Sequence, residues 1–152
     1  MAYRNVTDRG VKKPIDLATH IQNKMLKKNI DDLRHLGADI SNSKYKDEDI
    51  GSDKVMQQYI KELVTFLESY DFGRLDQRLS NIQWTAALNT VREMDEKAKE
   101  LGINPISKLL NDIAKTIKKR DDVGARQGLS LIEKKRNAIL TKLGRNRIWG
   151  DT

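Results

Sequence analysis

The sequence predicts an all-α protein: an antiparallel up-down helical bundle, similar to a four-helix bundle, with an additional N-terminal helix and basic tails. Three observations lead to this class. Apolar residues recur with the helical period along most of the chain, and no segment shows the alternation of a half-buried strand. The connections between the last three helical segments are short, which favours neighbouring helices that run in opposite directions. At 152 residues, the chain has the length of one domain.

The first helix is expected to begin at Pro14, because proline suits the first helical turn, and to stop at Gly37. Residues 38–52 are expected to form a long loop, since they are rich in Ser, Asn, Asp and Gly and show little periodicity. Ser52 or Asp53 then caps a second helix.

The second helix is expected to continue to about Tyr70, and the tripeptide Asp-Phe-Gly at 71–73 is interpreted as the break that follows it. Kinases use this tripeptide to hold magnesium, but the other kinase motifs are missing here. An apolar stripe continues over residues 74–101, with a phase change or kink near Gln83-Trp84, and Gly102 ends it.

Asn104 and Pro105 have the character of a cap and a first-turn proline for the next helix. The turn at 120–122 separates it from a last helix that Gly144 is expected to end. These boundaries divide the chain into a polar N-terminal arm over residues 1–14, a bundle domain over 15–143 and a C-terminal tail over 144–152.

Composition excludes several classes of function. The chain has no cysteine, so disulfides, thiolate catalysis and sulfur-ligated metals are excluded. No stretch is long and apolar enough to span a membrane, and His20 and His35 do not have the spacing of a metal site. No catalytic triad order or phosphate-binding glycine loop occurs. We therefore expect a non-enzyme with no cofactor and no metal, in an intracellular, cytoplasmic location.

The net charge of +7 is concentrated at the two ends. Lys and Arg outnumber Asp and Glu by seven to two in residues 1–28 and by ten to three in 118–147, whereas acidic residues exceed basic ones by sixteen to twelve in between. Such ends suit a phosphate backbone, an anionic membrane surface or an acidic protein. The C-terminal candidates for phosphate or nucleic-acid contact are Lys118, Lys119, Arg120, Lys134, Lys135, Lys142, Arg145, Arg147 and Trp149.

One helical run, WTAALNTVREMDEKAKELG at 84–102, suggests a family. Trp84, the closing pair Leu101-Gly102 and the following run INPISKLLNDIAKTIKKRD resemble the frame of the histidine phosphotransfer domain family, over about residues 55–143. In that family an exposed histidine accepts a phosphoryl group from a receiver domain, with a lysine three positions later and a glycine four positions later. The resemblance places Arg92 at the histidine position, Asp95 at the lysine position and Glu96 at the glycine position.

The chemistry of the family is not retained at these positions. A guanidinium stays protonated and has no lone pair with which to attack phosphorus, as a neutral imidazole does. Asp95 and Glu96 would repel a phosphoryl group. The resemblance therefore implies a degenerate member that keeps a docking surface, and generic bundle geometry is the other explanation of the same pattern.

Two functional hypotheses follow. The first is a non-catalytic helical adaptor or assembly subunit that acts by protein contact, with Arg92, Asp95 and Glu96 as partner-binding residues and an exposed Arg92 as its requirement. The alternative is a nucleic-acid-associated protein, for example of a viral or nucleoprotein assembly, that binds phosphate backbone through its basic termini.

Overall fold

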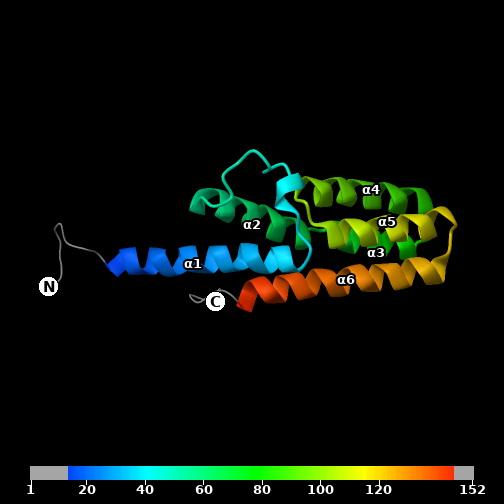
Figure 1. Cartoon of the computed structure of the whole chain (residues 1–152). Coiled ribbons are helices and arrows are strands. Elements are labelled where there is room, and N and C mark those ends of the chain that lie inside the picture. Colours follow the sequence, from blue (N-terminus) through cyan, green and yellow to red (C-terminus); the bar gives the residue numbers. More distant parts are fainter. Residues whose placement is uncertain (1–13, 146–152) are drawn as a thin grey trace.

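The computed structural model describes residues 14–145, with side chains for residues 25–144. Within this range the chain forms six α-helices and one short 3-10 helix, without any strand (Figure 1). The all-α helical class is therefore confirmed, whereas a strict antiparallel order of the helices stays a prediction. The helices are α1 (Pro14–His35), η1 (Ile40–Asn42), α2 (Asp53–Leu67), α3 (Asp71–Ser80), α4 (Trp84–Glu100), α5 (Asn104–Lys118) and α6 (Asp122–Arg145).

The helices form two groups that share α6. Helices α3, α4 and α5 pack together with the first part of α6, whereas α1 and α2 pack against each other and also contact α6 (Figure 1). At 24 residues, α6 is about 36 Å long, which lets it run along both groups. A single cluster of buried apolar side chains extends from Leu26 in α1 to Leu143 in α6.

Three expected helix boundaries differ from the structure. Residues 71–73 do not break the chain but form the first turn of α3, because Phe72 is buried and packs against Phe66 at a ring distance of 6.0 Å. The stripe over 74–101 is not one kinked helix but belongs to α3 and α4, which residues 81–83 separate. The last helix continues through Gly144 to Arg145.

The segment between α1 and α2 is anchored at its first half, although no long helix forms there. Ile40, Ser43 and Tyr45 are buried. The backbone N–H groups of Asp39 and Lys44 donate to the carbonyl oxygens of Gly102 and Glu100, both at 2.7 Å. This loop therefore covers the junction between α4 and α5 and connects the two groups of helices.

Glycine is needed where the loop meets this junction. Gly102 ends α4 with a φ of +66°, and the N–H of Ile103 donates to the carbonyl of Ala98 in the six-to-one pattern of a Schellman motif. A Cβ atom at position 102 would lie 2.2 Å from the carbonyl oxygen of Asp39. Both the left-handed backbone and the close approach of the loop therefore exclude a side chain.

Candidate functional site

Helix α4 is held rigidly by its neighbours α3 and α5. Its inward face follows the helical period, and the residues of that face are Ala87, Thr90, Val91, Met94, Asp95 and Ala98, all of them buried. Its first residue, Trp84, is partly buried and packs against the same core. The remaining positions of α4 form the outer surface of a helix that packs against α3 and α5.

The outer surface of α4 carries a polar stripe. Residues three, four and seven positions apart share one face of a helix, so Thr85, Asn89, Arg92 and Glu96 lie in one row, and all four are exposed. We call this row the α4 stripe. Arg92 lies at the centre of this row. The docking hypothesis requires Arg92 to be exposed, and it is.

Arg92 is one of two arginines for which no partner is found among the side chains of residues 25–144. Of the seven arginine side chains described between residues 25 and 144, two make no ion pair, hydrogen bond or cation–π contact there, and these are Arg92 and Arg120. The other five are engaged: Arg34 with Asp31, Arg74 with Asp71, Arg78 with Thr90, Arg126 with Asp76 and Ser80, and Arg136 over the ring of Phe72.

Asp95 does not lie beside Arg92 on the exposed stripe. Its carboxylate is buried, accepts a hydrogen bond from the Ser107 hydroxyl at 2.6 Å and forms an ion pair with Lys99 at 3.0 Å. The side chain therefore ties α4 to α5, which corrects its assignment as a partner-binding residue. The spacing held a signal for this position, because Asp95 lies four residues after Val91 and three before Ala98, both on the buried face. Glu96 is exposed and remains available.

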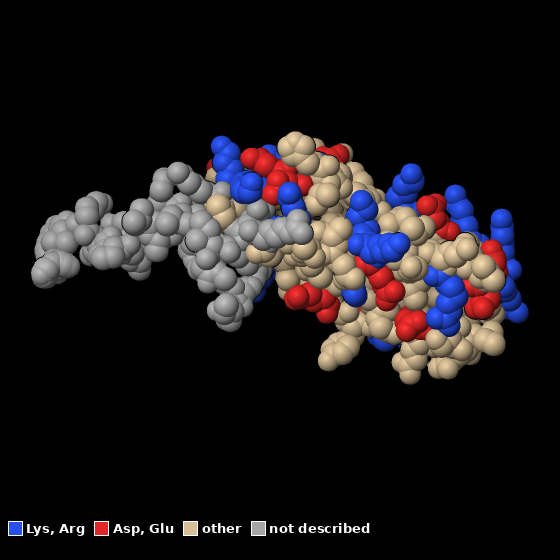
Figure 2. Space-filling view, turned by 90° about the horizontal axis from the view of Figure 1, so that it is seen from below, with Lys and Arg blue, Asp and Glu red and all other residues tan. Residues whose placement is uncertain are grey.

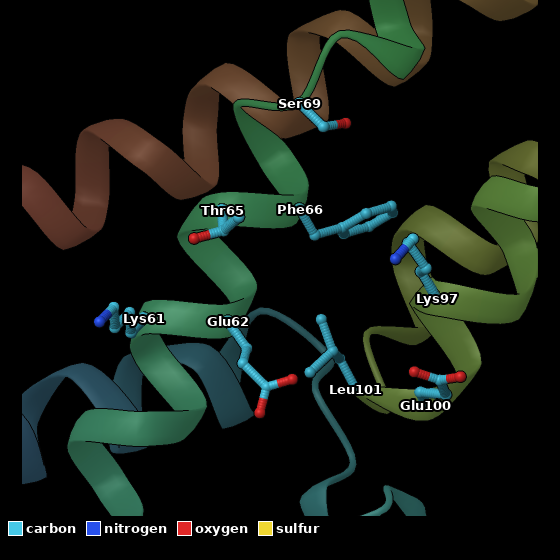
Figure 3. A pocket seen from close by; sticks show the side chains of 8 residues that line it. All are labelled: Lys61, Glu62, Thr65, Phe66, Ser69, Lys97, Glu100 and Leu101. Atoms are coloured by element: carbon cyan, nitrogen blue, oxygen red, sulfur yellow. The ribbon is translucent and has the colours of Figure 1, made fainter.

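The sequence did not reveal a pocket between α2 and the last turns of α4. It has a volume of about 270 Å³. In Figure 3, Phe66 projects from α2 toward α4, and charged side chains of both helices stand around the opening. The lining residues are Lys61, Glu62, Thr65, Phe66, Ser69, Lys97, Glu100 and Leu101. Glu62 is already engaged, because it accepts a hydrogen bond from the Tyr45 hydroxyl and pairs with Lys44 at 2.5 Å.

A buried tyrosine supports the floor of this pocket. The Tyr59 hydroxyl donates to the carbonyl oxygen of Leu101 at 2.6 Å, and its ring meets Tyr45 edge-on. Burial raises the pKa of Tyr59, so the hydroxyl stays protonated and remains a donor.

The candidates for phosphate contact do not form one surface. Lys118, Lys119 and Arg120 lie where α5 ends, whereas Lys134, Lys135 and Lys142 lie further along α6. About 30 Å of helix separates residue 122 from residue 142. The side chain of Arg145, together with Arg147 and Trp149, lies outside the described residues. The face seen in Figure 2 carries Asp and Glu among its Lys and Arg side chains.

The described residues hold neither a metal-binding cluster nor a membrane-spanning helix. Residues 25–144 contain no group of three or more His, Asp or Glu side chains placed to hold a metal ion. No helix in the described range has the length and hydropathy needed to cross a bilayer. No family model, no curated protein and no solved structure matches the chain.

Proposed function

We propose that this protein is a non-catalytic helical adaptor or assembly subunit that acts by protein–protein contact through the α4 stripe. The observation that supports this proposal is Arg92, an exposed arginine at the centre of a helix whose opposite face is buried, with no partner among the side chains of residues 25–144. Arginine is among the residues most enriched in interface hot spots, because its planar group pairs with carboxylates and stacks on rings.

The surroundings of Arg92 favour recognition of a partner over a structural role. Two other charges of α4 already have partners, because Glu93 lies 3.9 Å from Arg74 and Lys99 forms an ion pair with Asp95. Arg92 and Glu96 offer one charge of each sign on the same row. A partner with the complementary pair of charges would satisfy both without a change in the helix.

A more specific version of the proposal is that the protein is a degenerate phosphotransfer-like docking module. In this form the partner is a receiver domain, which would bind to α4 without phosphoryl transfer because Arg92 offers no nucleophile. The inward carboxylate of Asp95 removes one negative charge from the proposed contact and leaves Glu96 as the acidic residue of the stripe.

The test is co-purification of the tagged full-length protein from its native cell extract, after nuclease treatment. Arg92→Glu is compared with the wild type and with Arg34→Glu, which reverses an exposed arginine on α1. We expect one stoichiometric protein partner to remain bound to the wild type and to Arg34→Glu. The amount of this partner recovered with Arg92→Glu should be lower by about tenfold or more.

Two outcomes would contradict the proposal. A partner that binds Arg92→Glu as well as the wild type would show that the α4 stripe is not the contact surface. Partners that disappear with nuclease, and whose binding falls steeply between low and moderate salt, would favour phosphate-backbone binding through the basic residues.

A further inference from the structure

The end of the bundle where α3 meets α4 and α5 meets α6 exposes apolar surface. We call it the bundle tip, and it consists of residues 81–86 and 118–123. Ile82 is 68% exposed and Val123 is 67% exposed. Beside Ile82 lies an open hollow of about 540 Å³, which is lined by Ile82, Gln83, Trp84, Thr85, Ala86 and Arg120. Two turns that are far apart in the sequence therefore contribute to one hollow.

The backbone at the bundle tip has an unusual feature in both turns. Ile82 and Arg120 are the two non-glycine residues with positive φ in the described range, at +56° and +53°. Each ends a helix with the six-to-one bond of a Schellman motif, from Gln83 to Arg78 and from Asp121 to Thr116. Glycine is the usual residue at such a position, and a β-branched residue there is a rare exception.

The same motif carries glycine at the opposite ends of the helices. Gly37 and Gly102 end α1 and α4 with positive φ, and a Cβ atom at either position would collide with a neighbour. At the bundle tip there is room for side chains, and the sequence has isoleucine and arginine in place of the conformationally favoured glycine. Both side chains line the hollow, so the strained conformations present them to whatever occupies it.

The charge at the bundle tip indicates the chemistry of the occupant. Lys118, Lys119 and Arg120 are all exposed and make no ion pair with another described residue. Asp121, the next residue, uses one carboxylate oxygen to accept the N–H of Gly124 at 3.0 Å. Figure 2 shows Lys and Arg gathered around this end of the molecule, with fewer Asp and Glu among them.

We propose that the bundle tip binds an acidic amphipathic protein segment. Apolar side chains of the segment pack against Ile82 and Trp84 in the hollow, and its carboxylates pair with Arg120 and the two preceding lysines. This inference rests on the proposed function, because it names the partner chemistry of a molecule that works by contact. It adds a second surface, apart from Arg92, at the end of α4 where Thr85 belongs both to the α4 stripe and to the hollow.

An acidic protein segment fits these residues better than a nucleic acid does. The most exposed apolar side chain of the hollow is Ile82, and an aliphatic side chain does not stack on a base. Trp84, the aromatic residue of the hollow, is partly buried against the core. An amphipathic segment can match apolar and charged groups at the same time.

The test uses Trp84 as its reporter, in a full-length Trp149→Phe background so that one tryptophan remains. The probes are synthetic peptides of about 15 residues with leucines at helical spacing and glutamates elsewhere. In one matched peptide lysine replaces each glutamate, and in another serine replaces each leucine. We expect saturable binding of the acidic leucine peptide with a change in Trp84 emission, and binding about tenfold weaker or less for both matched peptides.

Glycine variants separate binding from folding. Ile82→Gly and Arg120→Gly remove the side chains but favour the left-handed backbone, so we expect an unchanged or raised Tm together with at least about a tenfold loss of peptide affinity. The control Tyr70→Ser removes an apolar side chain that is 91% exposed at the other end of α3, and it should bind the peptide as the wild type does.

Several results would overturn the inference. They are failure of every peptide to bind, unchanged affinity in both glycine variants, or a larger change of Trp84 emission with a single-stranded oligonucleotide than with the acidic peptide. If Arg92→Glu loses the native partner but no peptide binds the wild type, the binding role of the bundle tip is wrong and the role of the α4 stripe stands. If peptide binding depends on Ile82 and Arg120 but Arg92→Glu still binds the native partner as the wild type does, the bundle tip is a binding surface and the α4 stripe is not.

Discussion

At the residue scale, the space around each helix-ending residue with positive φ decides whether a side chain fits there. Four residues end helices with positive φ, and the space around each one distinguishes them. Gly37 meets the ring of Pro105 and Gly102 meets the backbone of Asp39, whereas Ile82 and Arg120 point into an open hollow. The same backbone conformation therefore allows close packing at Gly37 and Gly102, whereas at Ile82 and Arg120 it directs side chains into the hollow.

Gly102→Ala tests the closed end. The added Cβ atom would meet the carbonyl oxygen of Asp39 in a backbone conformation that alanine disfavours, so we expect the free energy of unfolding to fall by about 2–4 kcal/mol. Gly73→Ala is the control, because that position in α3 has open space around it, and stability there should stay constant or rise by up to about 1 kcal/mol. Urea unfolding measures both, and equal losses would contradict the steric explanation.

Tyr59→Phe tests the hydrogen bond to Leu101. Removal of the hydroxyl leaves a buried carbonyl unpaired, so we expect a loss of about 1–2 kcal/mol, whereas Tyr70→Phe on the surface should change nothing. Because the pKa of Tyr59 is raised by burial, its stabilising effect is fully present below about pH 10 and is lost as the pH rises toward the higher pKa of the folded state. Wild type and variant should therefore converge in stability at alkaline pH.

Asp39 gives a prediction for acid pH. Hydrogen bonds from the side chains of Ser41 and Asn42, at 2.5 and 2.6 Å, lower the pKa of its carboxyl group. Its contribution to stability is therefore fully present above the ordinary aspartate pKa of about 3.9 and is lost as the pH falls through the lower pKa of the folded state. Carboxyl titration by NMR should show the lowered pKa in the wild type and a higher value in Ser41→Ala; identical values would refute the assigned cause.

At the scale of helices, a polar contact fixes α4 against α5. The buried carboxylate of Asp95 joins the hydroxyl of Ser107, and the two residues are twelve positions apart. Asp95→Asn and Ser107→Ala should each cost about 1–2 kcal/mol, and the double variant should cost less than their sum. Urea unfolding of the four proteins gives the coupling energy, and strict additivity would show that the contact contributes nothing.

Helix ends could be predicted from the sequence where proline or glycine marks them. Pro14, Gly37, Gly102 and Pro105 stand at or beside the ends that the structure has. The separation of α3 from α4 was missed because Ile82, a residue type that normally avoids positive φ, occupies the turn. The tripeptide at 71–73 was misassigned because a glycine usually signals a break, although the buried Phe72 holds it in a helix.

The candidate site was predicted in part for a similar reason. Arg92 could be identified as exposed from its position opposite the apolar stripe. Asp95 was assigned to partner binding because the phosphotransfer frame puts it three residues after Arg92, and its actual partner Ser107 lies twelve positions later on another helix. The hollow at the bundle tip combines Ile82 with Arg120, 38 positions later, and only the packing of the helices brings the two together.

At the scale of the whole molecule, Arg92 and Arg120, which have no partner in the part of the chain that the structure describes, lie on the part of the bundle built from α3, α4, α5 and the start of α6. Arg92 is at the middle of α4 and Arg120 is at the bundle tip, whereas the loop that covers the α4–α5 junction lies at the opposite end. The molecule thus divides into a half that the loop, Gly37 and Gly102 stabilise and a half that offers exposed charges and apolar side chains to a partner.

The most direct test of contact through α4 uses the absence of cysteine in the chain, because a single introduced cysteine can be labelled at one site. Asn89→Cys carries a photocrosslinker one turn from Arg92, and Gln57→Cys carries it on the exposed face of α2 as the control. After nuclease treatment of native cell extract, we predict one protein crosslinked from position 89 and not from position 57. Equal crosslinking from both positions, or none from position 89, would contradict the assignment of α4 as the contact surface.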